Sequence, residues 1–182
     1  MRRRDLLAMP AIAASMLPGV ALADALPDAR VTDHRNRRRR LVSDVIGGRV
    51  VALDFVLTSC ATLCHVLSAA MAEAEALLGP RLGPRGAGLL SIGLDPIGDT
   101  PRELARYAER YGAGPDWSFV AVPHAPLEQL LRRLGGPEPG SEHAPMVLIL
   151  DARGVLRRLP GMPAPALIAE SVQAALAARA RA

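Results

Sequence analysis

Short apolar runs alternate along this chain with longer segments in which apolar residues recur every three or four positions. The apolar runs span residues 50–57, 89–94, 117–122 and 146–150, and each has the length of a β-strand. Within them apolar residues are nearly continuous, as is typical of strands buried on both faces of a sheet. A turn at residues 152–154 and a further run at 155–159 predict a hairpin partner for the last of these strands.

Helices are predicted between the strands by a change of period. The first, over residues 63–78, presents one stripe, consisting of Leu63, Leu67, Ala70, Met71, Ala74, Leu77 and Leu78, and Gly79-Pro80 ends it. A second begins at Thr100, which can cap it, with Pro101 suited to the first helical position and Glu103 completing a capping box with Thr100. Its predicted inner face consists of Leu104, Tyr107, Ala108 and Tyr111. Two more helices are expected, at residues 126–134 and in a last segment that buries Leu167, Ile168, Val172 and Leu176.

The order of these elements predicts the fold class. Residues 31–42 predict an N-terminal β-hairpin with Asn36 near its turn. Strands then alternate with helices, and the chain closes with a hairpin and a helix. This order indicates an α/β three-layer sandwich with a mixed central sheet. No internal repeat and no second domain are evident.

The N-terminus has the pattern of an export signal. Arg2, Arg3 and Arg4 precede an uncharged apolar stretch at residues 6–22, and Ala21-Leu22-Ala23 is a small-x-small cleavage pattern. We therefore expect residues 1–23 to be the signal, of the twin-arginine type, and residues 24–182 to form one periplasmic or exported domain. The alternative is that the segment is retained as a membrane anchor. It contains no cysteine, which argues against a lipoprotein.

Composition narrows the choice of partners. All 22 basic side chains are arginine, against 18 acidic ones, and loss of the signal would lower the net charge from +4 to +2. Because the charge is small and aromatic residues make up only 3 %, nucleic-acid binding is not expected. For the arginine run at residues 37–40, an exposed hairpin face is favoured over a binding patch.

The two cysteines, Cys60 and Cys64, fall where a buried strand gives way to a helix. The N-terminus of a helix favours thiolates, because its N–H groups carry partial positive charge. Two thiolates at this spacing can form a disulfide or bind one soft metal ion together. A purely structural disulfide is the weaker alternative, since it would close a very short loop and stabilise the fold little.

The same layout is that of a thioredoxin-like domain, in which a proline before a later strand is often cis and faces the cysteines. Ala144-Pro145 is placed for that role, which would bring His143 close to Cys60 and Cys64.

The chain also resembles the Sco/SenC family over residues 31–175. The resemblance rests on residues 54–60 with Cys64, on residues 91–101, on residues 107–112 with Trp117, and on residues 142–145. Proteins of this family are exported, thioredoxin-like copper proteins that help to assemble the copper centre of cytochrome c oxidase. The resemblance implies a copper-binding metallochaperone rather than an enzyme, with copper as Cu(I) or Cu(II). The implied partner is the copper-bearing oxidase subunit in its apo form, or another exported copper protein.

By that resemblance Cys60, Cys64 and His143 are the copper ligands. Thiolates select Cu(I), and imidazole suits either oxidation state of copper. The chain departs from the family in having Ala61 and His65 where proline usually follows each cysteine. For His65 a solvated position in the first helical turn is favoured over a ligand role, although its imidazole could lower the pKa of the Cys64 thiol.

The alternative function is an exported thiol–disulfide oxidoreductase that reduces the cysteines of a partner. In that mechanism Cys60 attacks and Cys64 resolves the mixed disulfide. The CxxxC spacing, one residue longer than the CxxC of redox thioredoxins, and the presence of His143 favour metal binding. A peroxidase is a weaker third option.

The remaining candidates are assigned structural roles. Asp95 is expected in a turn and Asp99 at the entry to a helix. A role for Asp99 in orienting a ligand is the less favoured interpretation. His34 and His124 are expected to be exposed, whereas Trp117 and Met71 are expected in the core.

Overall fold

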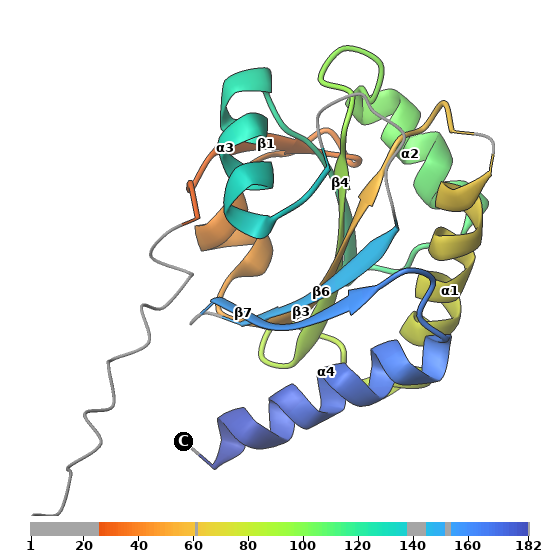
Figure 1. Cartoon of the computed structure of the whole chain (residues 1–182). Helices are drawn as coiled ribbons and strands as arrows, with labels where there is room; N and C mark the ends of the chain where they lie inside the picture. The colour runs from red at the N-terminus through yellow and green to blue at the C-terminus, as the bar shows by residue number, and fades with distance from the viewer. Residues whose placement is uncertain (1–25, 61, 138–144, 152–153, 182) are drawn as a thin grey trace, which may run out of the picture.

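The computed structural model describes residues 26–60, 62–137, 145–151 and 154–181 (Figure 1). Its strands form one seven-stranded sheet in the order β2-β1-β5-β4-β3-β6-β7. The strands are β1 (Arg30–Asp33), β2 (Arg38–Arg40), β3 (Val50–Val56), β4 (Ala87–Gly93), β5 (Trp117–Ala121), β6 (Met146–Asp151) and β7 (Gly154–Pro160). Each predicted strand is thus present, with bounds that shift by at most two residues.

The sheet is mixed, as predicted. Strands β3, β4 and β5 are parallel, whereas β6 and β7 on one side and β1 and β2 on the other are antiparallel to their neighbours. Every residue of β3 and β4 is buried, which explains their nearly continuous apolar sequences. Because the three central strands are parallel, the loops that follow them lie at one end of the sheet.

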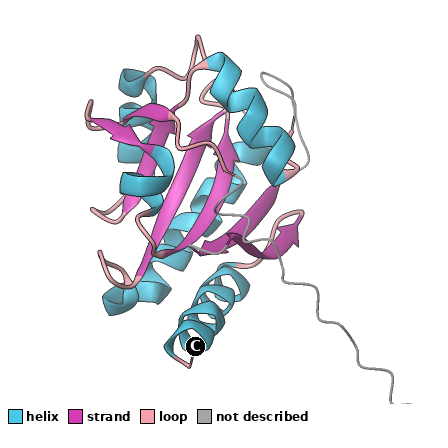
Figure 2. Cartoon of the chain, turned by 90° about the vertical axis from the view of Figure 1, so that its left-hand side faces the viewer, coloured by secondary structure: helices cyan, strands magenta, loops and turns pink. Residues whose placement is uncertain are grey.

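Helices cover both faces of the sheet (Figure 2). Helices α1 (Leu63–Leu78), α2 (Pro101–Arg110) and α4 (Pro165–Ala180) contribute to one core, and α3 (His124–Leu134) contributes to the other with η2 (Leu41–Ile46). The predicted α/β three-layer sandwich is therefore confirmed. The π-helical segment η2 was not predicted, and α3 begins two residues earlier than expected.

Two apolar cores lie on opposite faces of the sheet because successive side chains of a strand alternate. Ala52 and Val56 of β3 belong to the core beneath α1, whereas Leu53 and Phe55 belong to the core beneath α3. Trp117 and Met71 are fully buried in the first core, which confirms their predicted roles.

Three predicted core residues are exposed. Leu63, Leu77 and Leu167 expose 48 %, 53 % and 37 % of their surface. Leu63 and Leu167 lie in the first turns of α1 and α4, and Leu77 lies at the margin of the α1 stripe. Residues at the ends or margins of a stripe are covered by fewer neighbours, so periodicity alone overestimates their burial.

Two predicted turn features can be compared with the structure. Asn36 has a φ of 57° at the tip of the β1–β2 hairpin, which confirms the expected turn. The capping box of α2 forms only in part. Thr100 Oγ1 accepts a hydrogen bond from the Glu103 N–H at 3.3 Å, but the Glu103 carboxylate pairs with Arg106 at 2.8 Å instead of returning to Thr100.

The predicted signal, residues 1–23, lies outside the described residues. Among the residues that are described, no helix is long and apolar enough to cross a membrane.

Candidate functional site

The cysteine loop, residues 57–60, leaves β3 at the end of the sheet where β4 and β5 also end. A turn forms it, in which the Cys60 N–H donates to the Leu57 carbonyl oxygen at 2.9 Å. Helix α1 begins at Leu63, so Cys64 lies in its first turn. The predicted position of both cysteines at a strand-to-helix junction is therefore confirmed.

The two thiols are free and differ in environment: Cys60 is partly exposed and Cys64 is buried. Burial tends to raise the pKa of Cys60. Hydrogen bonds from the backbone N–H groups of Thr62 and Cys64, and from the side chains of the same two residues, outweigh this effect, so the pKa of Cys60 is lowered. Burial, together with the interaction with Cys60 and the charge of Asp54, raises the pKa of Cys64 to about 12. Cys60 is therefore the more acidic of the two thiols.

Asp99 holds the cysteine loop from the neighbouring loop after β4. Its Oδ1 accepts hydrogen bonds from the Thr58 N–H at 2.8 Å and from the Thr58 hydroxyl at 2.7 Å. Its Oδ2 accepts a third from the Asp95 N–H at 2.8 Å, and the side chain is buried. The predicted structural role of Asp99 thus extends beyond its own helix entry, to the loop that carries Cys60.

A buried carboxyl group, Asp54, lies under α1 and was not predicted as part of the site. Ser91 donates to Asp54 Oδ1 at 2.5 Å and accepts from the Trp117 indole N–H at 2.9 Å. In the described part of the chain Asp54 Oδ2 has no hydrogen-bond partner. Burial raises the pKa of Asp54 to about 7. The sequence does contain a signal for it, because Asp54 is the one charged residue in an otherwise apolar strand.

His65 lies in the first turn of α1, as expected, and is partly exposed. The pKa of the neighbouring Cys64 is raised rather than lowered, mainly by burial. The Nδ1 atom of His65 lies 2.5 Å from the Tyr111 hydroxyl oxygen. Its ring stacks on Tyr107, with 5.8 Å between the centroids. Tyr107 lies in α2 and Tyr111 directly follows it, so packing of α1 against the C-terminal end of α2 holds the imidazole in place.

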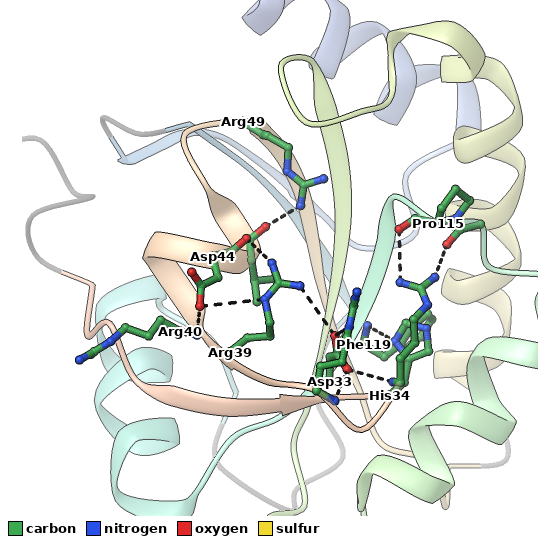
Figure 3. Close-up of polar contacts among 12 residues, drawn as sticks. Asp33, His34, Arg39, Arg40, Asp44, Arg49, Pro115 and Phe119 are labelled. Carbon is green, nitrogen blue, oxygen red and sulfur yellow. Dashed lines mark hydrogen bonds and ion pairs between the residues drawn. The ribbon is translucent and has the colours of Figure 1, made fainter.

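Of the other residues with predicted roles, Asp95 and His124 match the expectation and His34 does not. Asp95 lies in a turn, where its Oδ1 accepts from the Ile97 N–H at 2.9 Å, and His124 is exposed, both as expected. His34 is not fully exposed: it exchanges hydrogen bonds with the backbone of Phe119 (Figure 3). Burial lowers its pKa. A cross-strand partner, invisible in the sequence, accounts for this difference.

The predicted third ligand, His143, and the predicted cis bond between Ala144 and Pro145 lie outside the described residues. Within the described ranges no group of three or more His, Cys, Asp or Glu side chains is arranged to hold a metal ion. The described part of the site thus supplies two sulfur donors, Cys60 and Cys64.

The SCO1/SenC family model matches residues 30–115 of the chain. This span contains both cysteines, Asp54 and Asp99, so the resemblance predicted from the sequence is confirmed there. No curated protein sequence matches the chain.

Solved structures with the same fold include several Sco proteins. A SCO1/SenC family lipoprotein from Bacillus anthracis is 20 % identical with a TM-score of 0.68, over 84 % of this chain and 94 % of that one. BsSco, described as having a disulfide switch, is 19 % identical with a TM-score of 0.66, over 81 % and 91 %. Copper-bound ScoI from Bradyrhizobium japonicum is 15 % identical with a TM-score of 0.63, over 80 % and 96 %. These likenesses confirm the thioredoxin-like fold.

Proposed function

We propose that this SCO1/SenC-like chain is an exported copper-binding factor that takes part in the assembly of cytochrome c oxidase and carries copper as its cargo. The family match covers the cysteine segment, and the structures that share the fold include Sco proteins with copper bound. Residues 1–23 would export the chain to the periplasm or, if retained, hold it at the membrane surface.

One observation carries this proposal: two free thiols interact with each other at the start of α1. Thiolate sulfur is the donor that Cu(I) prefers, and it is a poor ligand for hard cations such as Mg²⁺. Cys60 and Cys64 therefore fit copper, with His143 proposed as the third ligand. A bound copper ion would supply a cationic centre that replaces the proton of Cys64.

The remaining residues of the site position these donors. Asp99 holds Thr58 and thereby the backbone that leads to Cys60. The contacts of His65 with Tyr107 and Tyr111 hold the first turn of α1, where Cys64 lies. A ligand set of only three residues would leave coordination space for a thiolate of the receiving subunit, which suits transfer by ligand exchange.

Copper binding can be tested by loading the reduced full chain with Cu(I) under anaerobic conditions and measuring the copper retained per chain. We expect one copper, lost in Cys60→Ser and in Cys64→Ser, and weakened in His143→Ala. His124→Ala is the matched control, because His124 is exposed on α3 and should not affect retention. A folded, fully reduced chain that retains no copper would contradict the proposal.

The different environments of the two cysteines favour thiol–disulfide exchange as a second function. A partly exposed thiol of lowered pKa beside a buried thiol is the arrangement needed for attack by Cys60 and resolution by Cys64. Reduction of a partner disulfide would form a Cys60–Cys64 disulfide and leave two thiols on the partner. His143→Ala separates the functions: it should impair copper retention and leave exchange with a small aromatic disulfide unchanged. If this variant loses exchange and keeps copper, the ligand assignment is wrong.

A further inference from the structure

A cavity of about 710 Å³ lies beside the N-terminal hairpin. Its walls come from the β1–β2 hairpin, η2, the loop after β4, the start of α2 and the end of β5. The lining residues are Arg30, Val31, Thr32, Arg38, Arg39, Arg40, Asp44, Pro96, Pro101, Ala121, Val122 and Pro123. The cavity is thus formed by segments far apart in the sequence, and it includes most of the arginine run.

The hairpin wall carries excess positive charge. Four arginines line the cavity against one carboxylate, Asp44. Arg39 lies between Asp33 and Asp44 (Figure 3), with the carboxylate oxygens 4.0 Å away in each case. Arg30 and Arg38 are exposed and form no ion pair with any described residue. The arginine run is therefore only partly neutralised within the chain.

Strand register places like charges side by side. Arg30 of β1 is directly opposite Arg40 of β2, and Arg38 lies two residues along from Arg40 on the same face. Like charges directly opposite in an antiparallel pair destabilise it. Asp28 offsets this in part, at 3.8 Å from Arg40. An anionic ligand in the cavity would relieve the repulsion that remains.

The rest of the lining is largely apolar. Pro96, Pro101, Ala121, Val122 and Pro123 carry no charge. A cavity lined by both arginines and apolar residues suits a ligand that has both carboxylates and apolar groups. Its volume lies within the range of about 300–1,000 Å³ typical of sites that enclose an organic ligand. An extended acidic peptide meets both requirements, because its side chains alternate in direction.

The loop after β4 connects the cavity with the cysteine loop. The loop after β4 contributes Pro96 to the cavity, and Asp99 in the same loop accepts two hydrogen bonds from Thr58. Between them, Ile97 is 88 % exposed. A segment bound in the cavity would therefore lie one loop away from the cysteine loop that leads to Cys60.

We propose that this arginine-lined cavity binds an extended acidic segment of a partner protein and thereby places that partner beside Cys60. Because exposed ion pairs are individually weak, we expect several arginines to contribute to binding together. We also expect a marked loss of binding at high salt. The surface is separate from the cysteines, and the proposal holds whichever chemistry they perform.

Fluorescence anisotropy of the full chain with a labelled peptide of alternating Glu and Val residues tests the proposal. We expect binding that weakens roughly tenfold in Arg30→Glu/Arg38→Glu. It should be unchanged in the control Arg133→Glu/Arg157→Glu, whose arginines are exposed on α3 and β7. A control peptide of alternating Gln and Val residues, which lacks the negative charges, should not bind. Arg30→Gln/Arg38→Gln, which removes charge without reversing it, should give an intermediate loss.

Three outcomes would overturn the proposal. The peptide could bind Arg30→Glu/Arg38→Glu as well as it binds the control Arg133→Glu/Arg157→Glu, which would mean diffuse attraction to the arginine-rich surface. Inorganic phosphate could displace the peptide at equal concentration of charge, which would identify a simple anion site. Phosphatidylglycerol vesicles could bind with the same dependence on Arg30 and Arg38 while the peptide does not, which would identify a membrane surface.

Discussion

Asp99 accepts both hydrogen bonds that Thr58 donates, from its backbone N–H at 2.8 Å and its hydroxyl at 2.7 Å, although 41 residues separate the two. The pair joins the loop after β4 to the loop that carries Cys60. It explains why an aspartate at the entrance to α2 matters to a site on α1. The geometry of the cysteines thus depends on a carboxylate that touches neither of them in any described contact.

Asp99→Ala should destabilise the chain, because it removes three hydrogen bonds to a buried carboxylate and leaves the donors of Thr58 and Asp95 without that acceptor. We expect the free energy of unfolding in urea to fall by about 3 kcal/mol. Ile97→Ala is the control, since this neighbouring side chain is 88 % exposed and its truncation should change stability by less than about 0.5 kcal/mol. Equal effects of the two substitutions would show that Asp99 does not anchor the loop.

Alkylation should distinguish the two cysteines. The pKa of Cys60 is lowered and that of Cys64 is raised to about 12, so at any given pH a larger fraction of Cys60 than of Cys64 is thiolate. Because the thiolate is the nucleophile, iodoacetamide should modify Cys60 at least about tenfold faster than Cys64. Mass spectrometry of Cys60→Ser and Cys64→Ser gives the separate rates. Modification of both cysteines at one rate would contradict the assignment.

Stability should depend on pH through Asp54. Burial raises its pKa from 3.8 to about 7, so between these values the folded state binds a proton that the unfolded state does not. The contribution of Asp54 to stability is therefore greatest below about pH 4 and is lost as pH rises through about 7. Asp54→Asn cannot ionise, so its stability relative to wild type should rise over that range by roughly 2–4 kcal/mol. Urea titrations at several pH values measure this difference, and a constant difference would contradict the assignment.

The only tryptophan gives an independent signal for the same group. Trp117 donates to Ser91, which in turn donates to Asp54. Ionisation of Asp54 should therefore change the intrinsic fluorescence of the wild type with a midpoint near pH 7. Asp54→Asn should abolish that transition. A midpoint that persists in the variant would assign it to another group.

Packing of α1 on α2 should depend on the contact between His65 and Tyr111. Tyr111→Phe removes the hydroxyl that lies 2.5 Å from His65 Nδ1 and keeps the ring contacts. We expect a loss of about 1 kcal/mol in the free energy of unfolding. A double-mutant cycle with His65→Phe should assign most of this loss to the pair. Additive effects would show that the two side chains do not interact.

Local patterns predicted the elements well because strand and helix periods are written in consecutive residues. Helix α1 has the predicted bounds, residues 63–78, and the nearly continuous apolar run that forms β3 is buried at every one of its residues 50–56. Errors occurred where burial depends on what covers a residue. Leu63 and Leu167 continue their stripes and are nevertheless exposed, because they lie at the starts of their helices, where fewer of the described residues cover them.

The sequence by itself determined the order of strands and helices, the α/β layers, the resemblance to the SCO1/SenC family and the position of Cys60 and Cys64 at a strand-to-helix junction. These features follow from local periodicity and from motifs that neighbouring residues complete. The tertiary structure alone decided that Asp99 holds Thr58, that Asp54 is buried with one oxygen unpaired among the described residues, that His65 packs on two tyrosines, and that four arginines line one cavity. Each of these arises between segments distant in the chain, and the sheet order and helix packing that bring them together are not encoded in any one segment.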